Sequence, residues 1–265
     1  MWKRKATTQP FTVLGTLSEA QRLTKGSMWA ILAPLFAFIV VSGALTCVFG
    51  LIFDAMNITD ISPRSTWAIA YSLASLFLFL VACVFVCAVS GVLKVAIRRV
   101  RTHHIVPANV GFHAFSRFVP VAITAFFISF LLIVPVIFIA LHIFIFVLYV
   151  FIIGVFFSLS LPLAVDKTNF PLAAMIYSAK TTSRYFLKIS SIFLILLGIF
   201  FIAYLPLDIG LVFHSKIISI IGGGILFLAM LWFLPFKYLV LSVMYHKLIY
   251  KTPNSFQNPE TNTPE

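Results

Sequence analysis

Residues 118–165 read FVPVAITAFFISFLLIVPVIFIALHIFIFVLYVFIIGVFFSLSLPLAV and contain no Asp, Glu, Lys or Arg. A single helix of that length would be about 72 Å long, at about 1.5 Å per residue. The hydrocarbon core of a bilayer is about 30 Å thick, so the stretch predicts two spanning helices joined by a tight turn. We expect His142 to mark that turn and to meet water there; the alternative is an ionisable group that lines a cavity inside the membrane.

Uncharged apolar runs of spanning length lie on both sides of this stretch. They cover residues 29–53, 65–93, 189–207 and 217–236. Together with the central pair they predict an all-α polytopic bundle of six transmembrane helices. The composition agrees, because only 10% of the residues are charged, whereas a soluble domain carries about 25%. A transmembrane barrel is disfavoured, since its strands would alternate apolar and polar residues.

The distribution of Lys and Arg predicts the orientation of the bundle. Of the 19 basic residues, 17 lie in the segments 1–28, 94–117, 166–188 and 237–265, which would share one side of the membrane. The positive-inside rule makes that side cytoplasmic, so we expect a multi-pass protein of a bacterial inner membrane with both termini in the cytoplasm. Because the basic residues flank spans and form no separate basic domain, we expect no nucleic-acid partner despite the net charge of +12.

Three parts can be distinguished along the chain. Residues 1–28 form a basic cytoplasmic segment, residues 29–250 the six-span domain, and residues 251–265 a polar tail that we expect to be disordered. Within the first part, Thr16 and Glu19 fit a capping box that would start an amphipathic helix.

A second amphipathic helix is predicted from Pro171 onward, since proline suits the first helical position. Its apolar positions include Met175 and Ile176, while Lys180 and Arg184 fall on another face. Such helices lie in the membrane interface, with basic side chains toward anionic lipid headgroups. The residues that we predict to contact headgroups are Arg22, Lys25, Arg98, Arg99, Arg101, Lys180 and Arg184.

The two basic helices also suggest an internal repeat. Arg22 matches Lys180 and Thr24 matches Thr182 at one constant offset, and each pair precedes a span; a looser third copy surrounds residues 115–118. The six spans would then form three units, each with a basic interfacial helix and two spans. The alternative is that every cytoplasmic flank of an inner-membrane helix is basic.

Three segments resemble a known membrane family. They are GTLSEAQRLTKGSMWAIL at 15–32, SLPLAVDKTNFPLAAMIYSAKTTSRYF at 160–186 and PFKYLVLSVMYHKLI at 235–249. They are similar to the six-span domain that is fused to some glycerophosphodiester phosphodiesterases and also occurs alone in bacterial inner-membrane proteins. The family's Trp after the central Ser is replaced by Ala179. The resemblance implies a fold and no reaction, because the phosphodiesterase activity belongs to a separate soluble domain.

The polar residues offer little for catalysis. No two carboxylates share a face inside a predicted span, so we expect no enzyme activity, cofactor or metal site. One arrangement stays open, in which Asp166 approaches His104 or His246 at the cytoplasmic surface. Serines such as Ser178 are interpreted as polar groups between helices. The three cysteines, Cys47, Cys83 and Cys87, lie inside predicted spans and are interpreted as packing residues.

Two functions are compatible with these features. The first is a non-enzymatic protein that organises the bilayer or envelope, or scaffolds partners, which would be unknown membrane proteins or further copies of the chain. The second is a transporter of a small solute or lipid, for which Pro135 and residues 222–224 give a faint broken-helix signal. Lys237 is expected to snorkel from the end of the last span; if that span runs on to Tyr245, it is buried and needs a partner.

Overall fold

The structure is a computed structural model that describes residues 11–57, 63–112, 118–133, 143–167, 170–213 and 215–250. Every regular element in these ranges is a helix, which confirms the all-α class. Several predictions fall outside the described ranges: the tails 1–10 and 251–265, most of the third repeat copy, Pro135 and His142.

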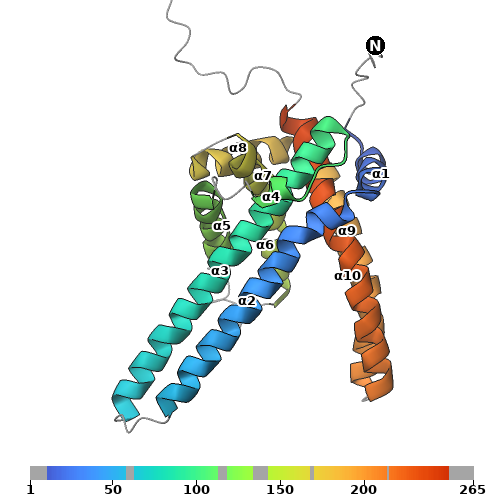
Figure 1. Ribbon diagram of the computed structural model, residues 1–265. Helices are drawn as coiled ribbons and strands as arrows, with labels where there is room; N and C mark the ends of the chain where they lie inside the picture. Colours follow the sequence, from blue (N-terminus) through green and yellow to red (C-terminus); the bar gives the residue numbers. More distant parts are fainter. Residues whose placement is uncertain are drawn as a thin grey trace, which may run out of the picture.

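Two long antiparallel helix pairs give the molecule its shape. Helices α2 (Met28–Asn57) and α3 (Pro63–Thr102) form one pair, and α9 (Phe186–Val212) and α10 (Lys216–Tyr245) form the other. A π-helical turn, His246–Tyr250, continues α10. The pairs meet at one end and diverge toward the other (Figure 1). Two shorter helices complete the apolar part: α5 (Phe118–Ile133), which contacts α3, and α6 (Ile143–Phe156), which contacts α9.

The short helices gather at the end where the pairs meet (Figure 1). They are α1 (Val13–Thr24), α4 (Asn109–Phe112), α7 (Ser160–Asp166) and α8 (Pro171–Arg184). Helices α1 and α8 each precede two long helices, as the first and last predicted units require, whereas most of the third predicted copy lies outside the described residues. The buried core also lies at this end, where Leu93, Leu163, Ile189, Leu239 and Tyr245 are fully buried. We call it the packed end.

Away from the packed end the helices expose apolar side chains. Leu51, Ile202, Phe227 and Leu228 are each more than half exposed. Exposing each of these side chains to water instead of burying it costs about 1.5–3 kcal/mol, whereas lipid is a favourable environment for them. Among the described residues, five helical segments are long and apolar enough to cross a membrane: Met28–Ile52, Leu80–Thr102, Val147–Asp166, Phe186–Val212 and Lys216–Ile249. The chain is therefore a multi-pass membrane protein.

The predicted count of six spans is only partly matched. The third predicted span corresponds to α5, whose apolar stretch Val119–Leu131 is shorter than the other five. The end of the last span also differs from the prediction. Helix α10 runs through Pro235 to Tyr245, so Lys237 lies within it. Neighbouring helices make proline tolerable in a spanning helix, so Pro235 did not mark an end.

The start of α1 differs from the prediction because one of the predicted capping residues has a partner elsewhere in the fold. The N-cap of α1 is Thr12, whose hydroxyl accepts a hydrogen bond from the Gly15 amide at 3.2 Å. Thr16 lies inside the helix, and Glu19 forms an ion pair with Lys247 at 2.8 Å. The predicted capping box is therefore wrong, because Glu19 has a tertiary partner.

Pro34 lies inside α2, which begins at Met28. It occupies a close contact between three helices: a Cβ built on Gly111 would lie 2.9 Å from Pro34 Cγ, and one on Gly91 would lie 2.9 Å from the Gly111 carbonyl oxygen. Small residues permit such close approach of helices in lipid.

A turn at residues 157–159 interrupts the helix between α6 and α7. Pro162 explains the position of the break, because its ring would clash with the carbonyl of Ser158 in a continuous helix. Ser178 of α8 satisfies the exposed backbone: its Oγ donates to the Phe156 carbonyl at 2.8 Å and accepts from the Leu159 amide at 3.2 Å. This confirms the interpretation of Ser178 as a polar group between helices.

The α9–α10 pair is held together by glycine contacts far from the packed end. A Cβ on Gly210 would lie 2.5 Å from the Ser219 nitrogen, and one on Gly222 would lie 2.6 Å from the Leu207 nitrogen. Helix α10 is continuous over residues 222–224, so the predicted broken-helix signal there is wrong. The glycines serve close packing instead.

Candidate functional site at the packed end

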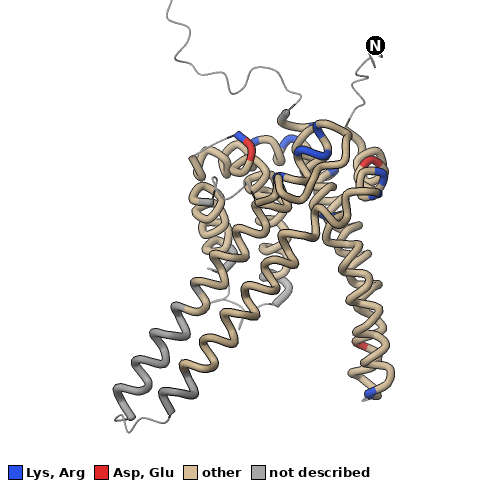
Figure 2. Tube along the Cα trace, viewed as in Figure 1, with Lys and Arg blue, Asp and Glu red and all other residues tan. Residues whose placement is uncertain are grey.

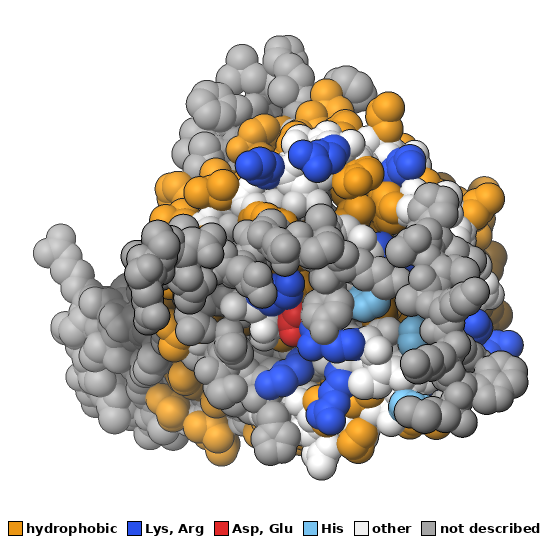
Figure 3. Space-filling view, turned by 90° about the horizontal axis from the view of Figure 1, so that it is seen from above, with side chains coloured by type: hydrophobic (Ala, Val, Ile, Leu, Met, Phe, Trp, Pro, Cys, Tyr) orange, Lys and Arg blue, Asp and Glu red, His pale blue; other side chains and the backbone are white. Residues whose placement is uncertain are grey.

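Basic side chains concentrate at the packed end. Figure 2 shows Lys and Arg around the short helices, with few charges along the long pairs. Figure 3 looks down on this end and shows basic side chains near an acidic one, with apolar side chains toward the rim. The charged residues here divide into those bound within the protein and those exposed.

Arg99 belongs to the first group. Its side chain is 8% exposed and donates to three carbonyl oxygens: those of Leu23 at 3.5 Å, Lys25 at 3.3 Å and His103 at 3.0 Å. Carbonyls at a helix C-terminus lack intrahelical partners, so Arg99 caps the end of α1 from α3. The side chain is therefore directed into the protein and not toward lipid headgroups.

Asp166 binds elements that are distant in the sequence. Its Oδ2 accepts from Arg101 Nη2 at 2.7 Å and from the Tyr245 hydroxyl at 2.6 Å. Tyr245 is fully buried. These contacts connect α3, α7 and α10. Arg101 and Asp166 form an ion pair, so the carboxylate compensates the positive charge of Arg101. The Asp166 carboxylate is thus bound by an arginine of α3 and a tyrosine of α10, and the catalytic arrangement with His104 or His246 stays a prediction.

Two further contacts fix α1 and the residues before it. Besides the Glu19–Lys247 ion pair, Lys188 Nζ donates to the Phe11 carbonyl at 3.1 Å. Ala20 and Leu23 are buried against the core, whereas Arg22 and Lys25 are exposed. The two faces predicted for this helix are therefore present, and its apolar face is covered by protein.

Helix α8 presents a mixed surface. It begins at Pro171, as predicted, and buries Met175, Ser178 and Thr182 against the bundle. The predicted apolar face is split, because Met175 is buried while Ile176 is 68% exposed. The bundle side is formed by Ala174, Met175, Ser178 and Thr182, and the apolar side chains of Leu172 and Ile176 are left outward.

The exposed part of α8 carries both charge and apolar surface. Lys180 and Arg184 are exposed, and so are Leu172 and Ile176. Of the predicted headgroup residues, six are exposed and one is buried. Those exposed and without an ion pair among the described residues are Arg22, Lys25, Arg98, Lys180 and Arg184, which we call the basic surface.

The described part of the chain contains no cluster of metal-ligating side chains and no disulfide. No three His, Cys, Asp or Glu side chains there are grouped to hold a metal ion. The cysteines are free, with Cys47 exposed and Cys83 and Cys87 half-buried.

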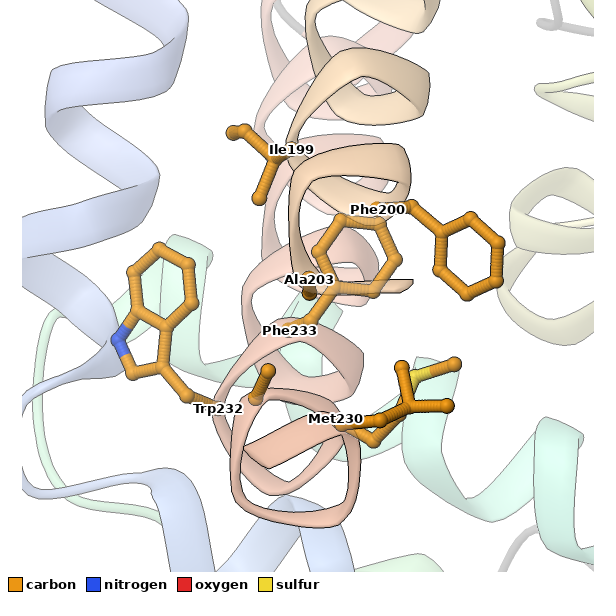
Figure 4. Close-up of a pocket in the computed structure, with 8 residues that line it drawn as sticks. Ile199, Phe200, Ala203, Met230, Trp232 and Phe233 are labelled. Atoms are coloured by element: carbon orange, nitrogen blue, oxygen red, sulfur yellow. The ribbon is translucent and has the colours of Figure 1, made fainter. Parts of the chain in front are cut away.

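A hollow of about 330 Å³ lies between α6, α9 and α10. Lys237 lines it, together with Phe151 of α6 and apolar residues of α9 and α10. A second hollow of about 40 Å³ between α9 and α10 shares the side chains of Phe200, Met230 and Phe233 with the first. In Figure 4, Phe200 and Met230 extend to one side of these helices and Trp232 to the other.

The sequence contained a signal for this hollow. On α10, Met230, Phe233, Leu234 and Lys237 recur at the spacing of one helix face, and residues 193, 196, 197 and 200 do the same on α9. A helix face that only contacts lipid is apolar throughout, whereas this face of α10 has a lysine at its end. The prediction missed it because the last span was expected to end at 236.

Comparison of the chain with protein-family models, with curated proteins and with solved structures gave no match.

Proposed function

We propose that this multi-pass protein crosses a bacterial inner membrane six times, with both termini and the packed end in the cytoplasm. In this proposal it is not an enzyme. It organises the bilayer or envelope, or holds partners, through a basic surface that binds anionic lipid headgroups. The resemblance to the phosphodiesterase-associated membrane domain is part of this proposal, as an expectation about fold.

The observation that carries the proposal is the mixed surface of α8. Lys180 and Arg184 are exposed beside the outward apolar side chains of Leu172 and Ile176. Apolar side chains can enter the boundary of the acyl region while basic ones meet phosphate, which is the arrangement of an interfacial helix. Arg22 and Lys25 extend the same chemistry to α1.

The expected strength follows from the number of charges. A basic residue near an anionic membrane surface contributes about 1 kcal/mol. Arg22, Lys25, Lys180 and Arg184 would together favour anionic over zwitterionic lipid by about 4 kcal/mol at low ionic strength. Salt screens exposed charges over about 8–10 Å, so the preference should weaken as salt is added.

The test is to change Arg22, Lys25, Lys180 and Arg184 to Gln together and to measure the phosphatidylglycerol that co-purifies with the protein. We expect the variant to retain clearly less than the wild type, with the difference shrinking at high salt. Lys216→Gln is the matched control, because Lys216 is exposed at the opposite end of α10 and should leave retention unchanged. Equal retention by the fourfold variant and the wild type would contradict a lipid-binding role.

The non-enzymatic part of the proposal has a separate test. Pure protein is assayed against glycerophosphodiesters and phospholipids, with Asp166→Asn and Asp208→Asn as paired variants. We expect no turnover that depends on Asp166, because its carboxylate is bound by Arg101 and Tyr245. Turnover lost in Asp166→Asn and kept in Asp208→Asn would place a reaction at the packed end.

A transporter is the alternative proposal. The hollow beside Lys237 is the feature that bears on it, and its remaining lining is apolar. Such a lining suits the acyl chain of an amphiphile better than a hydrated solute. Vesicle uptake assays with the purified protein would reveal transport directly.

A further inference from the structure

The depth of Lys237 along α10 is the starting observation. At about 1.5 Å per residue, Lys237 lies about 31 Å from Lys216 at the far end of the helix. The hydrocarbon core is about 30 Å thick. With Lys216 at one boundary of that core, the Lys237 ammonium group therefore lies near the other boundary, on the side of the packed end.

The hollow extends from Lys237 along the apolar part of the helices. Phe193 and Phe200 on α9 and Phe233 on α10 line it, and Phe151 of α6 lines it as well. Its volume of about 330 Å³ falls within the range of small-molecule sites in proteins. The lining is thus apolar along its length and carries one cation.

Lys237 also lacks a partner that would neutralise it. In the described ranges it forms no ion pair or hydrogen bond, and its Nζ lies over the ring of Tyr238, 5.8 Å from the ring centroid. At the boundary of the hydrocarbon core, a basic group is attracted to anionic lipid phosphate. An anion at the mouth of the hollow would supply the missing charge.

We propose that this hollow binds one anionic phospholipid, with its phosphate on Lys237 and an acyl chain along the phenylalanine side chains. Charge complementarity identifies the headgroup and the apolar lining identifies the chain. The proposal goes beyond the headgroup contacts of the basic surface and does not require them, because no residue of the hollow belongs to that surface.

The experiment uses the full-length protein in phosphatidylcholine nanodiscs that contain a small fraction of phosphatidylglycerol with a diazirine in one acyl chain. After irradiation, adducts are mapped by mass spectrometry. We expect adducts on residues 193–200 and 230–237, at higher yield than with the same label on phosphatidylcholine. Lys237→Met should lower the yield about fivefold, corresponding to about 1 kcal/mol per basic contact, and Lys237→Arg should preserve it.

Two tryptophan variants test the hollow itself. Leu197→Trp places a large side chain in the lining and should abolish the adducts, whereas Leu194→Trp, on an exposed position of α9 outside the lining, should leave them unchanged. The fourfold Gln variant of the basic surface should keep the adducts, which separates this site from the proposed function. Equal yields from both lipids, an unchanged yield in Lys237→Met, or crosslinks from the hollow to a second protein chain would each overturn the proposal.

Discussion

Replacing Gly222 by alanine tests the packing of the α9–α10 pair. The added Cβ would lie 2.6 Å from the Leu207 nitrogen and 2.7 Å from its Cα. These are backbone atoms, so no side chain can rotate away to make room. To reach ordinary contact at about 3.4 Å, the two helices must separate locally by about 0.8 Å, which loosens the packing on either side.

The expected cost is the difference of two effects. Overpacking a closely packed contact costs about 1–3 kcal/mol, while glycine to alanine in a helix interior gains up to about 1 kcal/mol of helix propensity. Gly223→Ala isolates the second effect, because a Cβ there meets nothing within 4 Å. The Gly222 variant should therefore be less stable than the Gly223 variant by about 1–3 kcal/mol.

Thermal unfolding of the purified protein in detergent measures this difference. At about 2–4 °C per kcal/mol for a chain of this size, a difference of 2 kcal/mol lowers the Tm by about 4–8 °C relative to Gly223→Ala. Equal melting temperatures for the two variants would refute the close contact between Gly222 and Leu207, and with it the register of the pair.

Three further substitutions test the contacts at the packed end. Arg99→Met should expose the Leu23 carbonyl at the end of α1 and cost about 1–3 kcal/mol, seen as faster amide exchange in residues 13–24; unchanged exchange would contradict the cap. Ser178→Ala should destabilise the break between α6 and α7 by about 1–3 kcal/mol in thermal unfolding, and a wild-type Tm would argue against it. Lys247→Met should increase proteolytic cleavage before Val13, because the Lys247–Glu19 ion pair that holds α1 is lost; unchanged cleavage would show that this ion pair does not hold α1 in place.

The coarse architecture was predictable because bilayer thickness limits helix length. Residues 189–207 and the observed Phe186–Val212 differ by only a few positions, since Lys188 and Asp208 bracket the apolar run. The amphipathic faces of α1 were also predictable, because the periodicity of one helix places Ala20 and Arg22 on different sides.

The burial and contacts of individual charged side chains could not be predicted, because they depend on which helices pack together. Arg99 and Arg98 are adjacent and chemically identical, yet one is buried against carbonyls of α1 and the other is exposed. That choice depends on where α1 packs, which local periodicity does not encode. Glu19 is a similar case, because its position suited a local cap and its partner lies at Lys247. The end of the last helix was predicted wrongly because a proline and a lysine together resemble a helix end, while packing at Pro235 allows α10 to continue to Tyr245.

The proposed orientation in the membrane can be measured by mapping the topology of the chain. Reporter fusions that distinguish cytoplasm from periplasm are placed at Thr102, at the packed end of α3, and at Asp60 and Ser215, in the loops at the far ends of the two predicted pairs. We expect a cytoplasmic signal at Thr102 and periplasmic signals at Asp60 and Ser215, because 17 of the 19 basic residues lie in segments on the Thr102 side. A cytoplasmic signal at Asp60 with a periplasmic signal at Thr102 would place the basic surface on the periplasmic side and rule out the proposed function.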